Sequence, residues 1–380
     1  MNNLFVVAVA LMMPGATVSQ FPSSEAWIEA DRATIRLDPE KFTELPRTTG
    51  ILAIGRGPTD PRPQNAVSAI VHAFDRYPLV AIGENHRNQQ IHDFIVLLVN
   101  DKRFSQKVDD VVVEFGSARY QDVIDRYTAG EAVRAGELRK VWRDTVNILV
   151  WDAPVYERFF KTVRTINQQH PKRQLRVLLA DPPIDWAKIR DRQDWERVGG
   201  TRDQHAAEVV EREVLAKHHR ALLIFGSEHV TRDTAFDAYG ATPDRKANVV
   251  ELLEARHPGS VLLIWSHMAG CMTSDLDPGL ASWQNPAYAV LKGTWLGAAA
   301  VGPRGQTPTL EQLADGFLYL GPTARLTNSR PSPRIYSDTV YLRELRRRNK
   351  IQGGSNTSEL NRLQRMSVKG RTQDLPPQLR

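Results

Sequence analysis

The chain has 380 residues, 41% of them hydrophobic and 25% charged, so it can bury a large core and is neither fibrous nor wholly disordered. Its formal charge of +6 is concentrated at one end. Residues 341–380 hold ten Lys and Arg against three Asp and Glu, whereas the residues before them hold 40 against 41. Because this body is nearly neutral and few Lys or Arg alternate with its aromatic residues, the core is not expected to bind nucleic acid.

The N-terminus begins with an apolar run from Leu4 to Met13, which no Lys or Arg precedes. The run has the length of a signal-peptide core and is too short to span a bilayer. We therefore predict a signal peptide at residues 1–19 and export to the periplasm or the extracellular space. The alternative is an ordinary buried N-terminal segment. Residues 20–65, rich in Pro, Arg and Thr, are interpreted as a lead-in segment.

Short apolar runs alternate with helical patterns from residue 66 to residue 322. The runs are residues 79–82, 111–113, 175–180, 221–225, 260–265 and 316–321. They are continuous rather than alternating, which is typical of strands that are buried on both faces. The sequence therefore predicts an α/β fold with a mainly parallel sheet flanked by helices.

Two segments differ from this alternation. Residues 117–170 contain helix-like stretches rich in aromatic residues and are longer than a crossover connection requires. We expect a helical insertion there, over the carboxyl ends of the strands; alternatively, its aromatic residues fill the core of a helical subdomain.

Residues 323–380 are rich in Arg, Ser, Asn, Gln and Pro, which predicts a basic, largely disordered tail. We expect it to be solvated, although its charge would also allow contact with an anionic surface.

Titratable side chains follow four of the apolar runs. They are Glu84 and His86, Glu114, Asp181, and Glu228 with His229. In open α/β sheets, ligands bind outside the carboxyl ends of the strands. If the strands are parallel neighbours, these side chains converge at one edge of the sheet, which is the candidate active site.

The residue types at this edge suit two chemistries. A histidine held by a carboxylate can accept a proton from water as a general base. Two histidines with two or three carboxylates could equally bind Zn, Mn or Fe. Each residue also has a structural interpretation, since a Glu at a strand end often forms an ion pair and Asp181, before two prolines, could shape a turn. The sequence contains no Gly-x-Ser-x-Gly elbow, no His-Glu-x-x-His helix and no phosphate-binding loop.

Four motifs occur in a familiar order. They are Gly-Glu-Asn-His at residues 83–86, Val-Val-Val-Glu ending at Glu114, the strand ending at Asp181, and Gly-Ser-Glu-His at residues 226–229. Together they resemble the erythromycin esterase/ChaN/TIKI-like superfamily (haem-binding uptake, Tiki superfamily, ChaN-like domain) over residues 66–322. The resemblance implies an α/β fold with the motif residues clustered above the sheet.

The resemblance also implies roles for these residues. Members similar to erythromycin esterase would use the motif histidine to activate water against a macrolactone, TIKI-like members would hydrolyse peptides with a divalent metal, and ChaN-like members are associated with haem binding. By position, His86 would be the base, Glu84 and Glu114 its supports, and His229 a second polar group. In the metal alternative, Glu84, His86, Glu114 and His229 are the ligands. Asp181 and Glu228 are further candidates for binding a cofactor.

The leading hypothesis is an exported hydrolase in which His86 activates water for attack on an ester or amide-like bond. The substrate would be a small molecule or a peptide, and no cofactor would be required. The alternative is a metal- or haem-binding protein of the ChaN-like type without catalysis. A third hypothesis is a catalytically silent scaffold that acts through the basic tail. The sequence does not predict the oligomeric state.

Overall fold

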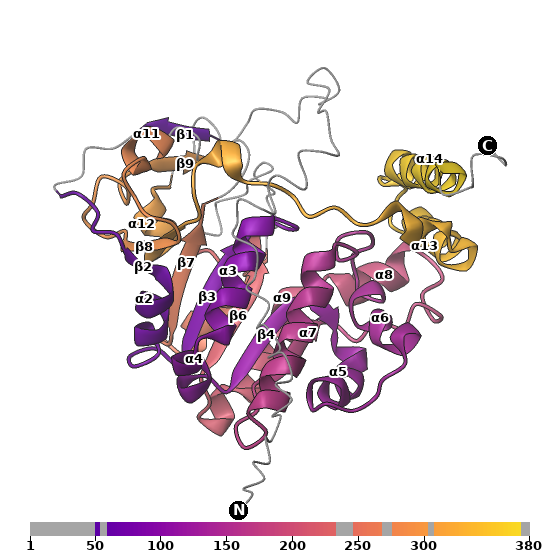
Figure 1. Ribbon diagram of the computed structural model, residues 1–380, viewed down its shortest axis with the longest axis horizontal. Coiled ribbons are helices and arrows are strands. Elements are labelled where there is room, and N and C mark those ends of the chain that lie inside the picture. Colours follow the sequence, from indigo (N-terminus) through magenta and orange to yellow (C-terminus); the bar gives the residue numbers. More distant parts are fainter. Residues whose placement is uncertain (1–49, 54–58, 233–245, 268–275, 303–307, 374–380) are drawn as a thin grey trace, which may run out of the picture. The chain divides into compact units, whose positions relative to one another are not determined.

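The structure is a computed structural model that describes residues 50–53, 59–232, 246–267, 276–302 and 308–373 (Figure 1). The described residues belong to one compact unit, Thr48–Arg380. The predicted signal peptide at residues 1–19, most of the predicted lead-in segment and the single cysteine, Cys271, lie outside the described residues.

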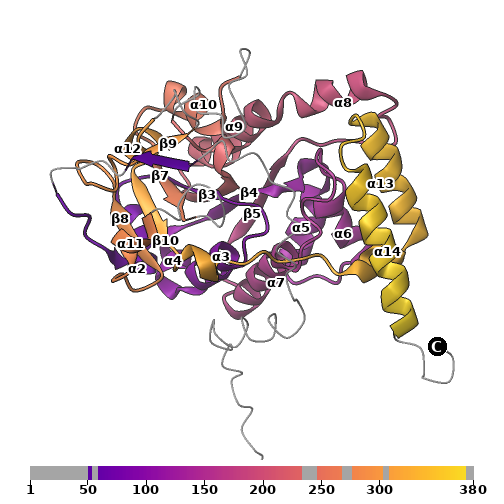
Figure 2. The same cartoon turned by 90° about the horizontal axis from the view of Figure 1, so that it is seen from above.

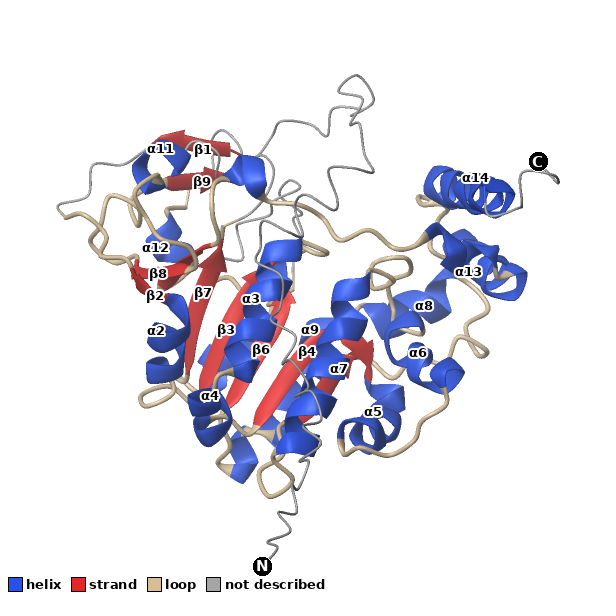
Figure 3. Ribbon diagram, viewed as in Figure 1, coloured by secondary structure: helices blue, strands red, loops and turns tan. Residues whose placement is uncertain are grey.

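The centre of the fold is a large sheet, shown in red in Figure 3. Within the described ranges it has eight strands: β2 (Gln64–Asn65), β3 (Leu79–Glu84), β4 (Asp110–Ser117), β5 (Arg176–Asp181), β6 (Ala221–Gly226), β7 (Val261–Ser266), β8 (Ala287–Val290) and β10 (Gly316–Tyr319). The strand order is β2-β8-β10-β7-β3-β6-β4-β5. The strands from β10 to β5 are parallel, and β8 runs antiparallel to both of its neighbours, β10 and β2. β1 (Gly50–Ala53) and β9 (Ala300–Gly302) form a separate two-stranded sheet.

Helices cover both faces of the sheet, which confirms the predicted fold class. They are α2 (Ala66–Ala73), α3 (Gln89–Asn100), α4 (Lys102–Lys107), α5 (Gln121–Thr128), α6 (Ala135–Arg143), α7 (Pro154–Gln169), α8 (Arg192–Gly199), α9 (Arg202–Glu213), α10 (Val249–Arg256), α11 (Asp277–Leu280) and α12 (Leu310–Leu313). Short 3-10 helices include η2 (Ala118–Tyr120), η3 (Leu215–Lys217), η4 (Ser227–His229) and η6 (Thr323–Arg325). Among the described helices, none has the length and apolar composition that a membrane span requires.

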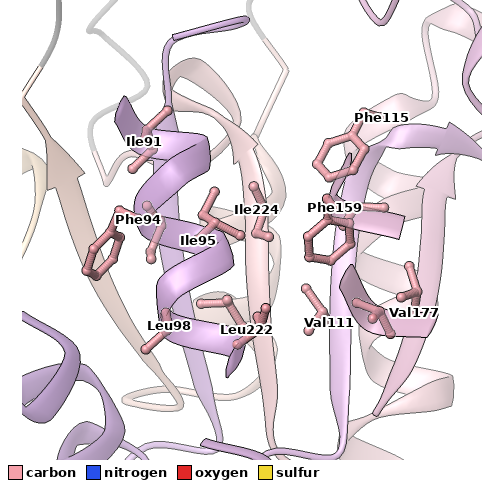
Figure 4. Close-up of a cluster of buried hydrophobic side chains, with 14 of the residues drawn as sticks. Ile91, Phe94, Ile95, Leu98, Val111, Phe115, Phe159, Val177, Leu222 and Ile224 are labelled. Atoms are coloured by element: carbon pink, nitrogen blue, oxygen red, sulfur yellow. The ribbon is translucent and has the colours of Figure 1, made fainter. Parts of the chain in front are cut away.

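Each strand contributes to two cores because successive side chains point to opposite faces. Val80 and Ile82 of β3 pack with α2, α3 and α7 on one face, whereas Leu79 and Ala81 pack with α9 and α10 on the other. Figure 4 shows the first of these cores, where side chains of α3 lie over Leu222 and Ile224 of β6. The continuous apolar runs in the sequence therefore result from burial on both faces.

Residues 117–170, predicted as a helical insertion over the carboxyl strand ends, include η2, α5, α6 and α7. α7 starts with Pro154, a residue suited to the first turn of a helix, and packs beside α3 on the face of the sheet. The loop of residues 144–153, between α6 and α7, reaches the carboxyl strand ends. There the backbone N–H of Val146 donates a hydrogen bond to Asp181 at 2.7 Å.

The C-terminal segment is helical, so the prediction of a largely disordered tail was wrong for residues 323–373. Its main elements are η7 (Pro333–Ser337), α13 (Thr339–Ile351) and α14 (Thr357–Gln373), and Figure 2 shows α13 and α14 beside α6. Leu342, Leu345, Leu360 and Leu363 recur at helical spacing and are buried in a third core with Val146 and other residues. Leucines at this spacing stabilise helices by burying one face of each, although the basic composition of the segment had predicted disorder.

Leu345 tests the packing of this segment because its side chain is fully buried. We expect Leu345→Ala to lower the free energy of unfolding by about 2–5 kcal/mol, through lost burial and the cavity left behind. Val340→Ala is the matched control on the same helix, since Val340 is 71% exposed, and it should change stability by less than about 0.5 kcal/mol. Equal urea midpoints for Leu345→Ala and the wild type would contradict this packing.

Candidate functional site

The carboxyl ends of β3, β6 and β4 lie side by side because β6 is the middle strand of the three. The register pairs Glu84, at the end of β3, with Gly226, at the end of β6. Strand alternation directs Glu84 to the face that α3 covers, and Glu114 of β4 to the face that α9 covers. The predicted strand-end residues therefore gather at one edge of the sheet, distributed over its two faces.

Glu84 is buried, and each of its carboxylate oxygens binds a histidine. Oε1 lies 2.8 Å from Nδ1 of His86, and Oε2 lies 3.0 Å from Nε2 of His92. Burial raises the pKa of Glu84, but His86 and His92 outweigh burial and lower this pKa to about 2. Because an ionised carboxylate can only accept hydrogen bonds, both histidines donate to Glu84. This leaves a lone pair on Nε2 of His86 when its ring is neutral.

The imidazole of His86 is enclosed on two sides. The Trp151 ring packs against it edge to face, with ring centroids 4.6 Å apart. On another side a Cβ at Gly226 would lie 2.8 Å from Cε1 of His86, so a larger residue at this position would displace the ring. Burial lowers the pKa of His86, but the charges of Glu84 and Glu114 raise it above its ordinary value. The side chain keeps 34% exposure, which gives water access to it.

Glu114 is the second buried carboxylate of the site. It accepts hydrogen bonds from the backbone N–H of Gly226 at 2.7 Å and from Nη2 of Arg202 at 2.5 Å, and Nε2 of His229 lies 3.4 Å away. Burial raises the pKa of Glu114, but His229, His86 and Arg202 hold it well below its ordinary value. Glu84 is therefore the hydrogen-bonded support of His86, and Glu114 acts on His86 through its charge.

His229 has a carboxylate at each ring nitrogen. Nε2 lies 3.4 Å from Glu114, and Nδ1 lies 2.7 Å from Oδ1 of Asp203. Burial lowers the pKa of His229, but Glu114 and Asp203 raise it to about 10. His229 is therefore a cation at neutral pH, so it is not a second general base.

Asp181 and Glu228 occupy different environments. Asp181 is buried, binds Nε of Arg202 at 3.2 Å and accepts the hydrogen bond from Val146. Burial raises its pKa to about 6, against the effect of Arg202. Asp181 thus joins α9 to the loop of residues 144–153. Glu228 is exposed on η4, and its backbone carbonyl accepts a hydrogen bond from Asn248 at 3.3 Å.

The predicted metal set of Glu84, His86, Glu114 and His229 is arranged as ion pairs, with both nitrogens of His229 and Nδ1 of His86 facing carboxylates. Metal ligands must direct free lone pairs toward one point, and no group of three or more such residues in the described part of the chain does so. A cavity beside Glu114 and His229 has a volume of about 10 Å³, which is room for about one water molecule. In the described part of the chain, these four side chains are therefore not arranged as one set of metal ligands.

Several residues of the site could not be identified from the sequence. His92, Trp151, Arg202 and Asp203 all contact the predicted residues. A detectable pattern exists for His92, which lies six residues after His86, near the start of a helix capped by Asn88. Arg202 and Asp203 begin α9, some twenty residues after Asp181, where no local pattern distinguishes them from other surface charges.

The charge of His229 predicts a dependence of stability on pH. Its pKa is raised from 6.5 to about 10, so its contribution to stability is fully present below pH 6.5 and is lost as the pH rises toward 10. We expect His229→Gln to flatten the decline of the free energy of unfolding over this range, measured by urea titration. His170→Gln, at an exposed histidine, is the matched control. An equal decline in wild type and His229→Gln would contradict the ion pairs.

No family model matches the sequence, and no curated protein matches it. Among solved structures, the chain is similar to a variant of the erythromycin esterase EreC in its open conformation (TM-score 0.50, 10% identity, covering 72% of this chain and 99% of that chain). It is also similar to a succinoglycan biosynthesis protein (TM-score 0.49, 9% identity, 72% and 96%) and to haem-binding ChaN of Campylobacter jejuni (TM-score 0.36, 13% identity, 53% and 86%). At such identities the likeness concerns the fold alone. The chain therefore has a fold like that of this erythromycin esterase, as the order of its motifs predicted.

Proposed function

We propose that this protein is a hydrolase in which His86 activates water for attack on an ester or amide-like bond. The observation that supports this most directly is the pair formed by Nδ1 of His86 and the buried Glu84 carboxylate, 2.8 Å apart. The pair fixes the ring and its tautomer, while the His86 side chain keeps access to solvent. The fold of an erythromycin esterase supports the same class of reaction by analogy.

The proposed reaction uses the free lone pair of His86. Nε2 accepts a proton from water as the water oxygen bonds to the carbonyl carbon of the substrate. The resulting imidazolium is stabilised by Glu84, which stays ionised because its pKa is about 2. His86 then returns the proton to the leaving alcohol or amine, and the product acid is released. No metal is needed in this sequence of steps.

His92 is proposed to fix the position of Glu84. Its Nε2 binds the carboxylate oxygen that His86 does not use, and its ring packs against Tyr156 with centroids 4.8 Å apart. Glu84 therefore cannot rotate away from His86 without losing a buried hydrogen bond.

The substrate and compartment belong to the same proposal. We propose a small-molecule or peptide substrate, since the structural similarity to an erythromycin esterase supports no narrower class of substrate for this chain. Export also stays a prediction, based on the apolar run near the N-terminus.

His86→Ala tests the proposal. Loss of a general base costs typically 10²–10⁴-fold in rate, so we expect kcat on any hydrolysed ester or lactone to fall by at least about 10²-fold. His170→Ala is the matched control at an exposed histidine and should retain wild-type activity. Equal hydrolysis by wild type and His86→Ala would contradict the proposal, and haem absorbance or bound metal in purified protein that hydrolyses nothing would favour the ChaN-like alternative.

The pH profile gives a second test. Only neutral His86 can accept a proton from water, and its pKa lies above the ordinary value of 6.5. We therefore expect kcat/KM to be low at acidic pH and to rise as the pH passes an apparent pKa above 6.5. A profile that falls with increasing pH across neutrality would show that the catalytic group acts in its protonated form.

A further inference from the structure

The loop of residues 144–153 has one side in the candidate site. Trp151 packs against His86, with centroids 4.6 Å apart, and against Tyr156, with centroids 5.0 Å apart. Arg87, which has a positive φ of 70°, holds the loop from the same side by donating to the carbonyls of Leu149 and Val150 at 2.7 and 3.1 Å. The loop is therefore a wall beside the proposed base.

The C-terminal segment of residues 333–363 contacts the same loop, together with Arg143 of α6. The hydroxyls of Tyr336 and Tyr341 donate to Oδ2 of Asp152 at 3.1 and 2.9 Å, and Nε of Arg143 donates to Oδ1 at 3.0 Å. The Asp152 side chain is 1% exposed, so water cannot replace these donors. A buried carboxylate that loses its hydrogen-bond donors is an uncompensated charge, and keeping it buried in the same position then costs free energy.

Further contacts attach the same segment to the loop. Arg348 is buried and donates to Asp144 at 2.7 Å, and Gln352 donates to the carbonyl of Val146 at 2.8 Å. Ile148 and Leu149 share the third core with Leu345 and other apolar residues of α13 and α14. These bonds span about two hundred positions of sequence, so the loop conformation depends on the end of the chain.

No hydrogen bond of the described structure fixes the Trp151 side chain. Within the described part of the chain, its indole N–H has no hydrogen-bond acceptor, although the side chain is 1% exposed. A buried donor without an acceptor costs free energy, so the ring is kept in place by its neighbours in space and in sequence. The next residue, Asp152, is attached by hydrogen bonds from Tyr336, Tyr341 and Arg143.

We propose that residues 333–363 position Trp151 against His86 through Asp152, and so shape the substrate-binding wall of the site. Asp152, Tyr336 and Tyr341 are positioning residues, because none of them contacts His86 in the described structure. The consequence for binding rests on the proposed function. The placement of Trp151 against His86 does not, and it can be measured separately.

The test uses the full chain with Tyr336→Phe and Tyr341→Phe combined, which removes both hydroxyl donors and keeps both rings. Tyr77→Phe, two residues before β3 begins, is the matched control. The first readout is the imidazole NMR signal of His86, which the ring current of Trp151 displaces. We expect this signal to shift in the double variant, while Tyr77→Phe leaves it in place.

A double-mutant cycle separates positioning from general loosening. In a Trp151→Phe background, the two tyrosine substitutions should shift the His86 signal much less than they do in the wild type. If the tyrosine variant fails to fold, Asp152→Asn replaces it in the same cycle, because it removes the charge that the hydroxyls bind and keeps the volume. An unmoved His86 signal in a folded variant, or an equal shift with and without Trp151, would overturn the inference.

The second readout concerns the substrate. With an ester that the wild type hydrolyses, we expect the tyrosine variant to raise KM by roughly tenfold with a smaller change in kcat, as misplaced contact groups do. A moved His86 signal with unchanged KM would retain the positioning role and overturn the role in binding. If the wild type hydrolyses nothing, the proposed function fails, and the NMR cycle still decides the positioning role.

Discussion

Glu84 ends a fully buried strand, and its negative charge is stabilised by two imidazoles, one from the turn after the strand and one from the next helix. Removing a carboxylate from water costs several kcal/mol, so the charge and its two partners must stay together. This constraint fixes the tautomer and orientation of His86 and places His92 on the buried side of α3. The remainder of the site is arranged around an imidazole that cannot turn.

A second buried carboxylate is stabilised in the same way on the other face of the sheet. Glu114 lies in β4, the strand on the other side of β6, three residues before this strand ends. It is stabilised by Arg202, His229 and a backbone N–H of Gly226. Gly226 lies between the two carboxylates. Because Gly226 has no side chain, the His86 ring can lie close to the negative charge of Glu114. The strand order therefore places both buried carboxylates, Glu84 and Glu114, beside the same glycine.

The sequence predicted those features that depend on local pattern. Apolar runs that stop at Glu84, Glu114 and Asp181 indicated parallel strands with polar ends, and the structure places these ends at one edge of the sheet. Arg202 could not be predicted, because its pairing with Glu114 spans 88 positions and arises from tertiary packing. The C-terminal helices were missed for a different reason: a few leucines at helical spacing, such as Leu345, bury enough apolar surface to order a strongly basic segment.

The central claim is that Glu84 holds His86 as a base, and an NMR titration of the His86 imidazole tests it most directly. In the wild type we predict a pKa above 6.5, since Glu84 and Glu114 outweigh burial. In Glu84→Gln, which keeps the side-chain volume and removes the charge, this pKa should fall because burial is then opposed by less negative charge. An identical His86 pKa in wild type and Glu84→Gln would contradict the account.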